Sequence, residues 1–472
     1  MGKRPWRRRG IWVGDTWLPE GREFEHILIC GMTGSGKSTI VRQLLMQIRE
    51  RNEPAIIIDP HFEFARLFFD ATTDTLLYPP DFYCPFWTPW LEIRSEFTNI
   101  TRQDIRSLTA ALFRRKDEWQ LMGQVVLNEI LDRCMDRDSP RRVAEFLVQD
   151  TRKLEAALTK TLAGKFVGAD GKALAMGVLA AVAEVIEPFY SLPATKAEAP
   201  CQWSAREWAR DPHGWLFLSS IEEGRTSAQP LQAMWFDLLS QGLLSRQQPS
   251  RVWVIADELP VLGLQPRIPQ LISEGRKRWL SVVIGFQTVA QLRAVYNRDK
   301  AQEITNGTGT RIMLRGNGES AEWEGEQLGK YNREPLVTGT DVQMLPAFWG
   351  FASVTGHLPA WLHVSRPKPR MESYPNPLLR KPPLKARGDE KKIFDNIKSG
   401  RHGAPAYQNV ECRFPDADAM VQELGRNRFG NEQVARKGDK GHYEPGNIEW
   451  KTREENKRDY TRKEVNDAKE YS

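Results

Sequence analysis

The sequence predicts an α/β fold with a mostly parallel sheet, because apolar runs of strand length alternate with helical segments along most of the chain. Two further observations agree with this fold. The runs are apolar throughout, as in strands buried on both faces, and a glycine-rich turn joins the first run to a helix. The expected strands are His26–Cys30, Ala55–Ile58, Trp215–Leu218, Val252–Ala256, Ser281–Gly285, Arg311–Leu314 and Phe351–Thr355.

A helical insertion interrupts this alternation. Residues 96–199 contain almost no strand pattern, and their apolar residues recur at helical spacing in LTAALF, QVVLNEILDRCM and ALAMGVLAAVAEVIEPF. We therefore expect an inserted all-α domain there, with the α/β domain formed by residues 23–95 and 200–366.

The two ends of the chain differ from this body. Residues 1–22 read as a basic arm carrying Arg7, Arg8 and Arg9, either solvated or in contact with lipid head groups or DNA phosphates. Residues 367–391 are rich in Pro, Lys and Arg and are expected to form a linker. Residues 392–472 then form a small separate α+β module.

The composition excludes several classes of protein. A chain of 472 residues, 40% apolar and 27% charged with a net charge of +6, is that of an ordinary soluble protein. The five cysteines are scattered without metal-ligand spacing, which argues against structural zinc and a disulfide framework. The apolar stretch Ala173–Ala183 is about half the length of a membrane span. We expect a cytoplasmic protein without a transmembrane segment, with peripheral attachment at the inner membrane as the alternative.

A phosphate-binding loop follows the first expected strand. The segment fits the pattern G-x-x-x-x-G-K-[ST], and its strand-before, helix-after context is the one this motif requires. Glycines let the backbone N–H groups converge on phosphate oxygens, and the helix directs its positive end at the same anion. The nucleotide-binding residues are expected to be Gly31, Met32, Thr33, Gly34, Ser35, Gly36, Lys37, Ser38 and Thr39.

Acidic residues for the same chemistry follow the strand Val252–Ala256. Ligands bind at the carboxyl ends of strands in open α/β sheets, so Asp257 and Glu258 are expected beside the loop. Lys37 would reach the β- and γ-phosphates of the bound nucleotide, while Ser38 and Asp257 would hold Mg²⁺. Glu258 would orient and deprotonate the attacking water. The sequence therefore predicts a P-loop NTPase.

Two further residues are candidates for catalysis. Gln287 ends the strand before it and would place an uncharged polar group near the γ-phosphate, although a turn residue is the alternative. Arg276 lies in the basic cluster GRKR, which is either a solvated turn or the source of an arginine that stabilises transition-state charge across a subunit interface.

The chain resembles the coupling-protein ATPases of conjugation and type IV secretion, the TraD/TrwB kind. The matching segments occur in the family's order and are GMTGSGKST, IIIDPHFEFARLF, GWLFLSS, VIADELPVLG, EGRKRWLSVVIGFQTVAQL and RIMLRGNGESAEWEGEQLG. The resemblance extends from Glu20 to Pro367 and includes the helical insertion.

This resemblance implies a RecA-like motor domain carrying the all-α domain, hexamers around a DNA channel, and hydrolysis coupled to DNA movement. It implies that Arg276 acts in trans and that Gln287 is the family's strand-terminal glutamine. DNA, a relaxase or relaxosome, and secretion-channel proteins are the implied partners. Coupling proteins usually begin with a membrane-spanning segment, whereas this chain starts almost directly at the motor. We therefore expect membrane attachment to be lost or delegated to a partner.

The C-terminal module has a second resemblance, to phage- and intron-type HNH endonucleases, in NVECRFPDADAMVQELGRNR and GHYEPGNIEWKTREENKRD. Those enzymes carry Asp or His before Arg in the first arm of their metal site, whereas Ala435 precedes Arg436 here. Asn447 remains where the last metal-side residue belongs. Because a site lacking one ligand binds its metal poorly, the resemblance implies a DNA-binding module more than an active nuclease.

Three other functions stay open at this point. A segregation or packaging ATPase of the HerA/FtsK kind is the nearest, although the helical insertion favours the coupling-protein branch. The chain could instead be a DNA nuclease that uses ATP hydrolysis for access. It could also be a nucleotide-dependent adaptor that recruits a relaxase without moving DNA.

Overall fold

A computed structural model of the chain describes residues 10–365 apart from short gaps, and isolated stretches beyond them, chiefly 432–436 and 447–452. The gaps are residues 95–97, 114–116, 134–137, 149–150, 168–171, 223–224 and 248. The chain divides into two compact units, Met1–Pro375 and Asn376–Ser472. Most of the architecture lies in the first unit.

A nine-stranded sheet forms the centre of the described part of the first unit, with the strand order β13-β12-β9-β3-β8-β7-β4-β6-β5. The strands from β9 to β5 are parallel, while β12 pairs antiparallel with β9 and β13 antiparallel with β12. The strands are β3 (Ile27–Cys30), β4 (Ala55–Asp59), β5 (Thr75–Leu76), β6 (Trp215–Ser219), β7 (Val252–Ala256), β8 (Leu280–Phe286), β9 (Thr310–Leu314), β12 (Trp349–Val354) and β13 (Ala360–His363).

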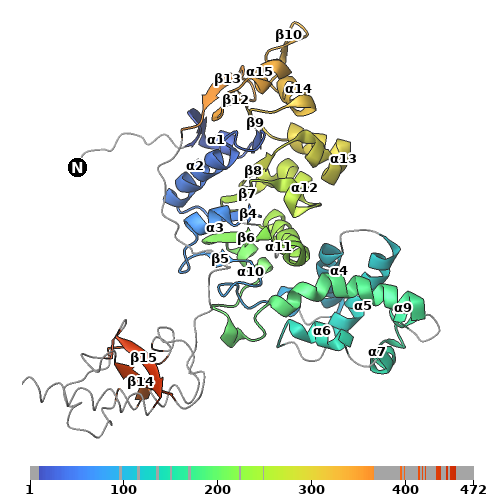
Figure 1. The fold of residues 1–472 in the computed structure, drawn as a ribbon. Helices are drawn as coiled ribbons and strands as arrows, with labels where there is room; N and C mark the ends of the chain where they lie inside the picture. The colour runs from blue at the N-terminus through green and yellow to red at the C-terminus, as the bar shows by residue number, and fades with distance from the viewer. Residues whose placement is uncertain are drawn as a thin grey trace, which may run out of the picture. The chain divides into compact units, whose positions relative to one another are not determined.

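Helices cover both faces of the sheet, which explains why its strands are apolar throughout (Figure 1). Along β4, Ala55 and Ile57 pack into one hydrophobic core, and Ile56 and Ile58 pack into the other. The first core lies under α2 (Lys37–Glu50) and α3 (Glu63–Phe68). The second lies under α10 (Ala205–Arg210), α11 (Arg225–Ser245), α12 (Ile268–Glu274) and α13 (Val289–Asn306).

The prediction of an α/β fold with a mostly parallel sheet is confirmed. All seven expected strands are present within two residues of their expected ends. The structure adds the edge strand β13 and the short strand β5. It also adds a hairpin of β1 (Gly10–Val13) and β2 (Thr16–Pro19) within the segment expected to be a basic arm. Ile11, Val13 and Leu18 of this hairpin are buried in the core under α2, so residues 10–19 are part of the folded body.

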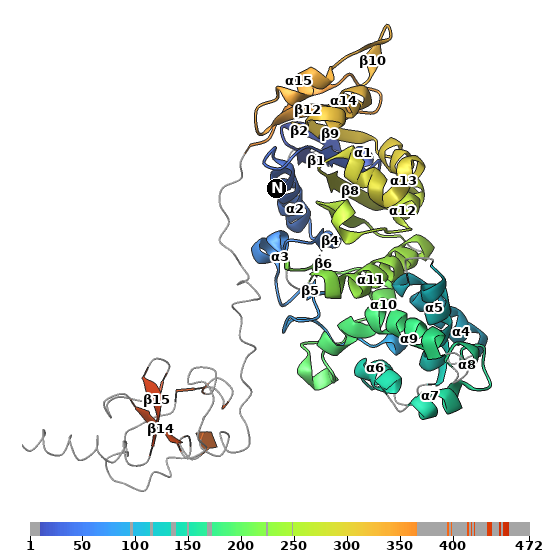
Figure 2. The same ribbon diagram turned by 45° about the vertical axis from the view of Figure 1, so that its right-hand side comes forward.

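The helical segment between β5 and β6 lies at one end of the sheet, next to α10 and α11 (Figures 1 and 2). Its buried residues, such as Val126 of α5 and Val182 of α9, belong to the same core as the adjacent face of the sheet. The helices are α4 (Thr98–Leu112), α5 (Glu118–Arg133), α6 (Arg141–Val148), α7 (Thr151–Leu158), α8 (Gly164–Val167) and α9 (Lys172–Ile186). The helical segment therefore shares its hydrophobic core with one face of the sheet.

The apolar helix α9 is longer than the sequence pattern indicated. It continues through a 3-10 turn, so that Ala173–Ser191 is the one helix among the described residues with the length and composition of a membrane span. Val178 and Val182 are nonetheless fully buried against the neighbouring helices, and Phe189 packs on Trp87. These contacts are those of a core helix.

The second unit is described only in part. Its β14 (Glu432–Arg436) pairs antiparallel with β15 (Ile448–Thr452), and Ala435 lies opposite Glu449. Val434 and Ala435 are both buried. Most of the two segments that resemble HNH endonucleases lies outside the described residues, so this resemblance stays a prediction.

The remaining described elements are short. The first unit also contains α1 (Glu20–Glu23), the hairpin of β10 (Lys330–Tyr331) and β11 (Glu334–Pro335), α14 (Gly318–Gln327) and α15 (Gly339–Gln343). Its 3-10 turns are η1 (Pro89–Glu92), η3 (Glu187–Ser191), η4 (Lys196–Glu198), η6 (Leu259–Leu262) and η7 (Gly275–Arg278).

Candidate nucleotide-binding site

The loop Gly31–Ser38 joins the carboxyl end of β3 to the amino end of α2. Gly34 and Gly36 have φ values of 78° and 119°, a left-handed region that side chains rarely adopt. Gly36 is also the N-cap of α2, so the helix directs its free backbone N–H groups into the loop. The curled backbone and the helix end together form a receptor for an anion.

Lys37 holds the loop closed from within. Its side chain is almost buried, at 8% exposure, and its Nζ donates a hydrogen bond of 2.9 Å to the carbonyl oxygen of Gly31. The ammonium group therefore lies inside the curl of the loop, where a phosphate group would meet it.

Asp257 meets the P-loop directly, since the Ser38 hydroxyl donates a 2.8 Å hydrogen bond to Asp257 Oδ2. Burial raises the pKa of Asp257 to about 6, although the hydrogen bond from Ser38 opposes the shift. Its other oxygen, Oδ1, is buried and has no hydrogen-bond partner among the described residues. A hydroxyl beside an unsatisfied carboxylate oxygen is a donor set that fits Mg²⁺.

Glu258 and Gln287 lie beside this pair. Burial raises the pKa of Glu258, while the charge of Lys37 and hydrogen bonds from Gln287 lower it. The Gln287 side chain also accepts a 3.1 Å hydrogen bond from the hydroxyl of Thr33 in the P-loop. Gln287 therefore connects the P-loop to the acidic residue.

The strand order explains this meeting. β8 lies between β3, which leads into the P-loop, and β7, which leads into Asp257 and Glu258. Because the three strands are parallel, the residues that follow them emerge at the same edge of the sheet. Gln287 follows the middle strand and therefore lies between the loop and the acids.

Arg276 lies away from these residues. It precedes β8 in the turn η7, at the amino edge of the sheet, whereas the P-loop lies at the carboxyl edge. Its side chain is 67% exposed, and its Nη1 lies 3.6 Å from Glu25 Oε1. The structure thus brings together every predicted site residue except Arg276.

A family model described as the type IV secretion-system coupling protein DNA-binding domain matches residues 11–339. The chain belongs to this family. The match covers the hairpin β1–β2, the P-loop, the helical segment and the acidic residues, and it confirms the resemblance drawn from the motifs.

Individual coupling proteins agree with the family assignment. The coupling protein TraD of Escherichia coli (strain K12) is 26% identical over 401 residues, which is 76% of this chain and 55% of that relative. This chain therefore spans about half the length of the curated relative it matches. Similar solved structures include TrwB in an unbound form and TrwB with ADP and Mg²⁺, both 23% identical with a TM-score of 0.68 over 79% of this chain. They cover 91% and 92% of the TrwB chains and show that this chain has the RecA-like P-loop NTPase fold.

Glu324 is a member of this coupling-protein site that the motif analysis did not single out. It lies on α14 and is fully buried, and its Oε1 accepts hydrogen bonds from Cys30 Sγ at 3.1 Å and Ser320 Oγ at 3.3 Å. Burial raises the pKa of Glu324 to about 7, and burial together with Glu324 raises that of Cys30 well above its usual range. Since Cys30 immediately precedes Gly31, Glu324 supports the P-loop from behind.

A sequence signal for Glu324 was present but ambiguous. The glutamate falls within the matching segment RIMLRGNGESAEWEGEQLG, which contains four glutamates. Helical spacing alone does not show which of them faces the core. Ser320 and Glu324, four residues apart on α14, do face the same side, but only the position of β3 shows that Cys30 meets them.

Proposed function

We propose that this chain is an ATP-dependent DNA translocase that moves DNA in conjugative or type IV secretion transfer. The observation that carries the proposal is the 2.8 Å hydrogen bond between Ser38 and Asp257, which joins the P-loop to the acidic strand end. TrwB has been solved with ADP and Mg²⁺, with a GTP analogue and with an ATP analogue. These ligands support nucleotide binding at the matching loop of this chain.

Each site residue has a role in the proposed hydrolysis. The P-loop N–H groups and Lys37 would bind the β- and γ-phosphates, and Ser38 and Asp257 would hold Mg²⁺. The metal, when bound, neutralises charge that develops on the phosphate oxygens. Glu258 accepts a proton from the attacking water, a task helped by its raised pKa. Gln287, hydrogen-bonded to both Thr33 and Glu258, orients that water.

The proposal includes assembly into a ring, the hexamer that the resemblance implies, with Arg276 serving the neighbouring subunit. Because Arg276 and the P-loop lie at opposite edges of one sheet, a single chain does not bring them together. A neighbour that presents its amino edge to this carboxyl edge would supply the guanidinium group, as in other NTPases. The DNA, relaxosome and secretion-channel partners expected from the family belong to the same proposal.

Phosphate release in the presence and absence of DNA tests the motor function. We expect hydrolysis by the wild-type chain to rise with DNA and with protein concentration, and Lys37→Ala to abolish it because the phosphates lose their main cation. Ser245→Ala, which alters an exposed hydroxyl at the end of α11, is the control. A hydrolysis rate that did not change with DNA at any protein concentration would contradict the proposal. Comparing ATP with GTP would define the base preference.

A further inference from the structure

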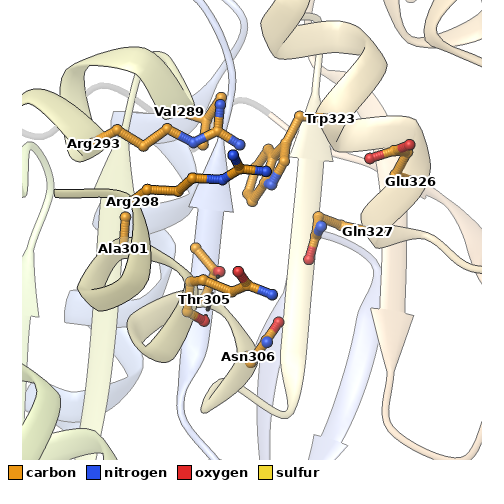
Figure 3. Close-up of a pocket in the computed structure, with 10 residues that line it drawn as sticks. Val289, Arg293, Arg298, Ala301, Thr305, Asn306, Trp323, Glu326 and Gln327 are labelled. Carbon is orange, nitrogen blue, oxygen red and sulfur yellow. Dashed lines mark hydrogen bonds between the residues drawn. The ribbon is translucent and has the colours of Figure 1, made fainter.

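A pocket lies between α13 and α14, on the face of the sheet that carries the helical segment (Figures 1 and 3). It lies beside a break in α13 at Asn297, whose backbone has φ 59° and ψ 173°. The Asn297 side chain accepts a 3.0 Å hydrogen bond from the backbone N–H of Lys300 and so restarts the helix. The break brings Arg293, at the end of the first half, beside Arg298, at the start of the second half (Figure 3).

The two walls of the pocket differ in chemistry. Arg293 and Arg298 project from α13 toward Trp323 of α14, which faces them across the pocket (Figure 3). The indole of Trp323 is held in place by Phe286, with 5.9 Å between ring centroids. The remaining lining is rich in amide side chains, namely Gln302, Asn306 and Gln327.

The charges around the pocket leave one guanidinium group available. Arg293 Nη1 lies 2.7 Å from Glu319 Oε1, so its charge is compensated. Glu326, on the wall of the pocket, lies 4.0 Å from Lys330. Arg298 has no carboxylate partner among the described residues and is exposed.

We propose that this pocket binds one unpaired nucleotide of a DNA strand, with the base on Trp323 and its phosphate on Arg298. An aromatic ring facing a guanidinium group is the pair of contacts that single-stranded nucleic acids use, because every base offers a π-face and every nucleotide a charge. The amide side chains supply donors and acceptors for the edge of the base. The cavity, of about 180 Å³, has room for one such ring system. This inference rests on the proposed DNA-translocating function.

The pocket is connected to the nucleotide-binding site by hydrogen bonds. Val289, which lines the pocket, donates its backbone N–H to Ser320 Oγ at 3.3 Å, and Ser320 donates to Glu324 at 3.3 Å. Glu324 in turn accepts from Cys30, directly before the P-loop. Trp323 is the neighbour of Glu324 on α14. A DNA strand held in the pocket therefore contacts the helix that supports the P-loop.

Direct binding of a short labelled single strand tests the phosphate contact. We expect Arg298→Ala to weaken binding at least about fivefold. The slope of the logarithm of affinity against the logarithm of salt concentration should fall by about one, the amount expected for one lost phosphate contact. Lys300→Ala is the matched control, because it removes the same charge from the same exposed half of α13 outside the pocket lining. Equal affinities for the two variants would overturn the assignment of Arg298. Competition by unlabelled mononucleotide distinguishes a strand from a free nucleotide as the ligand, and complete competition at equal concentration would overturn the DNA assignment.

Photo-crosslinking tests the base contact. An oligonucleotide carrying 5-iododeoxyuridine is expected to give an adduct on the peptide that contains Trp323. Trp323→Phe, which keeps an aromatic ring, should weaken DNA binding less than Trp323→Leu does. Adducts found only on other peptides would overturn the stacking assignment. If Arg298→Ala weakened binding to blunt duplex DNA as much as binding to a single strand, the assignment of an unpaired nucleotide would be overturned. If the pocket variants bind DNA as tightly as the wild-type protein does, the pocket inference fails while the motor function stands. Failure of wild-type protein to bind DNA at all would overturn both.

Discussion

Glu258 illustrates how a single residue acquires its chemistry from its surroundings. It follows the fully buried strand β7, is itself only 5% exposed, and has a pKa raised by burial. Lys37 and Gln287 oppose that rise in pKa, because a positive charge and hydrogen bonds favour the carboxylate form that the proposed role as a base requires. The sequence predicted the position of Glu258, but its neighbours depend on the order of the strands.

Glu258→Gln is expected to stop hydrolysis while leaving nucleotide binding in place. An amide keeps the size of the side chain but cannot take a proton from water, so the hydrolysis rate should fall by about 10²–10⁴. A fluorescent ATP analogue measures binding, and single-turnover phosphate release measures the chemical step. Loss of binding equal to the loss of rate would show that Glu258 has a structural role instead.

Glu324 is expected to make stability depend on pH. Because its pKa rises from 4.5 to about 7 in the folded protein, the folded state binds more protons than the unfolded state between those values. Its contribution to the free energy of unfolding is up to about 3 kcal/mol. This contribution is fully present below about pH 4.5 and is lost as pH rises through 7. Thermal unfolding of wild-type protein and Glu324→Gln between pH 5 and 8 tests this. A variant with the same pH dependence as the wild type would contradict it.

At the scale of the elements, β8 lies between β3 and β7 and so positions the site. The point where β8 comes closest to Asp257 is Gly285, which has no side chain. A Cβ on Gly285 would lie 2.0 Å from the backbone oxygen of Asp257. The strand therefore passes the acidic turn at a distance that only glycine allows. The close approach of β8 at Gly285 therefore helps to place the Asp257 carboxylate, which we propose as a ligand of Mg²⁺.

Gly285→Ala is expected to destabilise the protein by about 1–3 kcal/mol. It should also lower the hydrolysis rate by more than the loss of folded protein accounts for. The added methyl group would displace the backbone of Asp257, which holds Ser38 through a 2.8 Å hydrogen bond. Chemical denaturation and steady-state hydrolysis below the unfolding transition measure the two effects. Ser281→Ala, on the same strand, is the control. An unchanged rate would show that the acidic turn tolerates the shift.

The sequence predicts the buried elements well and the edges poorly. Val252–Ala256 was predicted to the residue because a strand buried on both faces is apolar throughout. The edge strand Ala360–His363 was not predicted, since Trp361 is 62% exposed and the run has no buried pattern. The break of α13 at Asn297 was also not foreseen, because its positive φ depends on the packing of both halves. Likewise, a three-dimensional contact with Cys30 reveals Glu324 and helical periodicity does not.

At the scale of the whole molecule, the two edges of the sheet have different expected tasks. The carboxyl edge carries the P-loop, Asp257, Glu258 and Gln287, while the amino edge carries Arg276 in an exposed turn. The motif order predicted both sets of residues, but only the fold shows that they lie on opposite sides. Assembly of several chains is the arrangement that would bring them together.

Arg276→Ala is expected to reduce the hydrolysis rate by about 10³ without weakening nucleotide binding by a single chain. The side chain is 67% exposed and its ion pair with Glu25 is long, at 3.6 Å, so folding should be little affected. Lys277→Ala, the exposed neighbouring cation, is the control. Sedimentation of both variants checks that oligomerisation is retained. A normal rate in assembled Arg276→Ala would rule out the role in trans.

The separation of Arg276 from its own P-loop has a consequence for a cell that holds many free copies of the chain. If Arg276 acts in trans as proposed, an isolated copy would bind ATP yet lack the group that completes the reaction, so it would hold its nucleotide without hydrolysing it. Ring formation would then switch hydrolysis on, and ATP would be consumed only where copies have gathered. The distance across one sheet would thereby confine hydrolysis to the place where the proposed motor meets DNA.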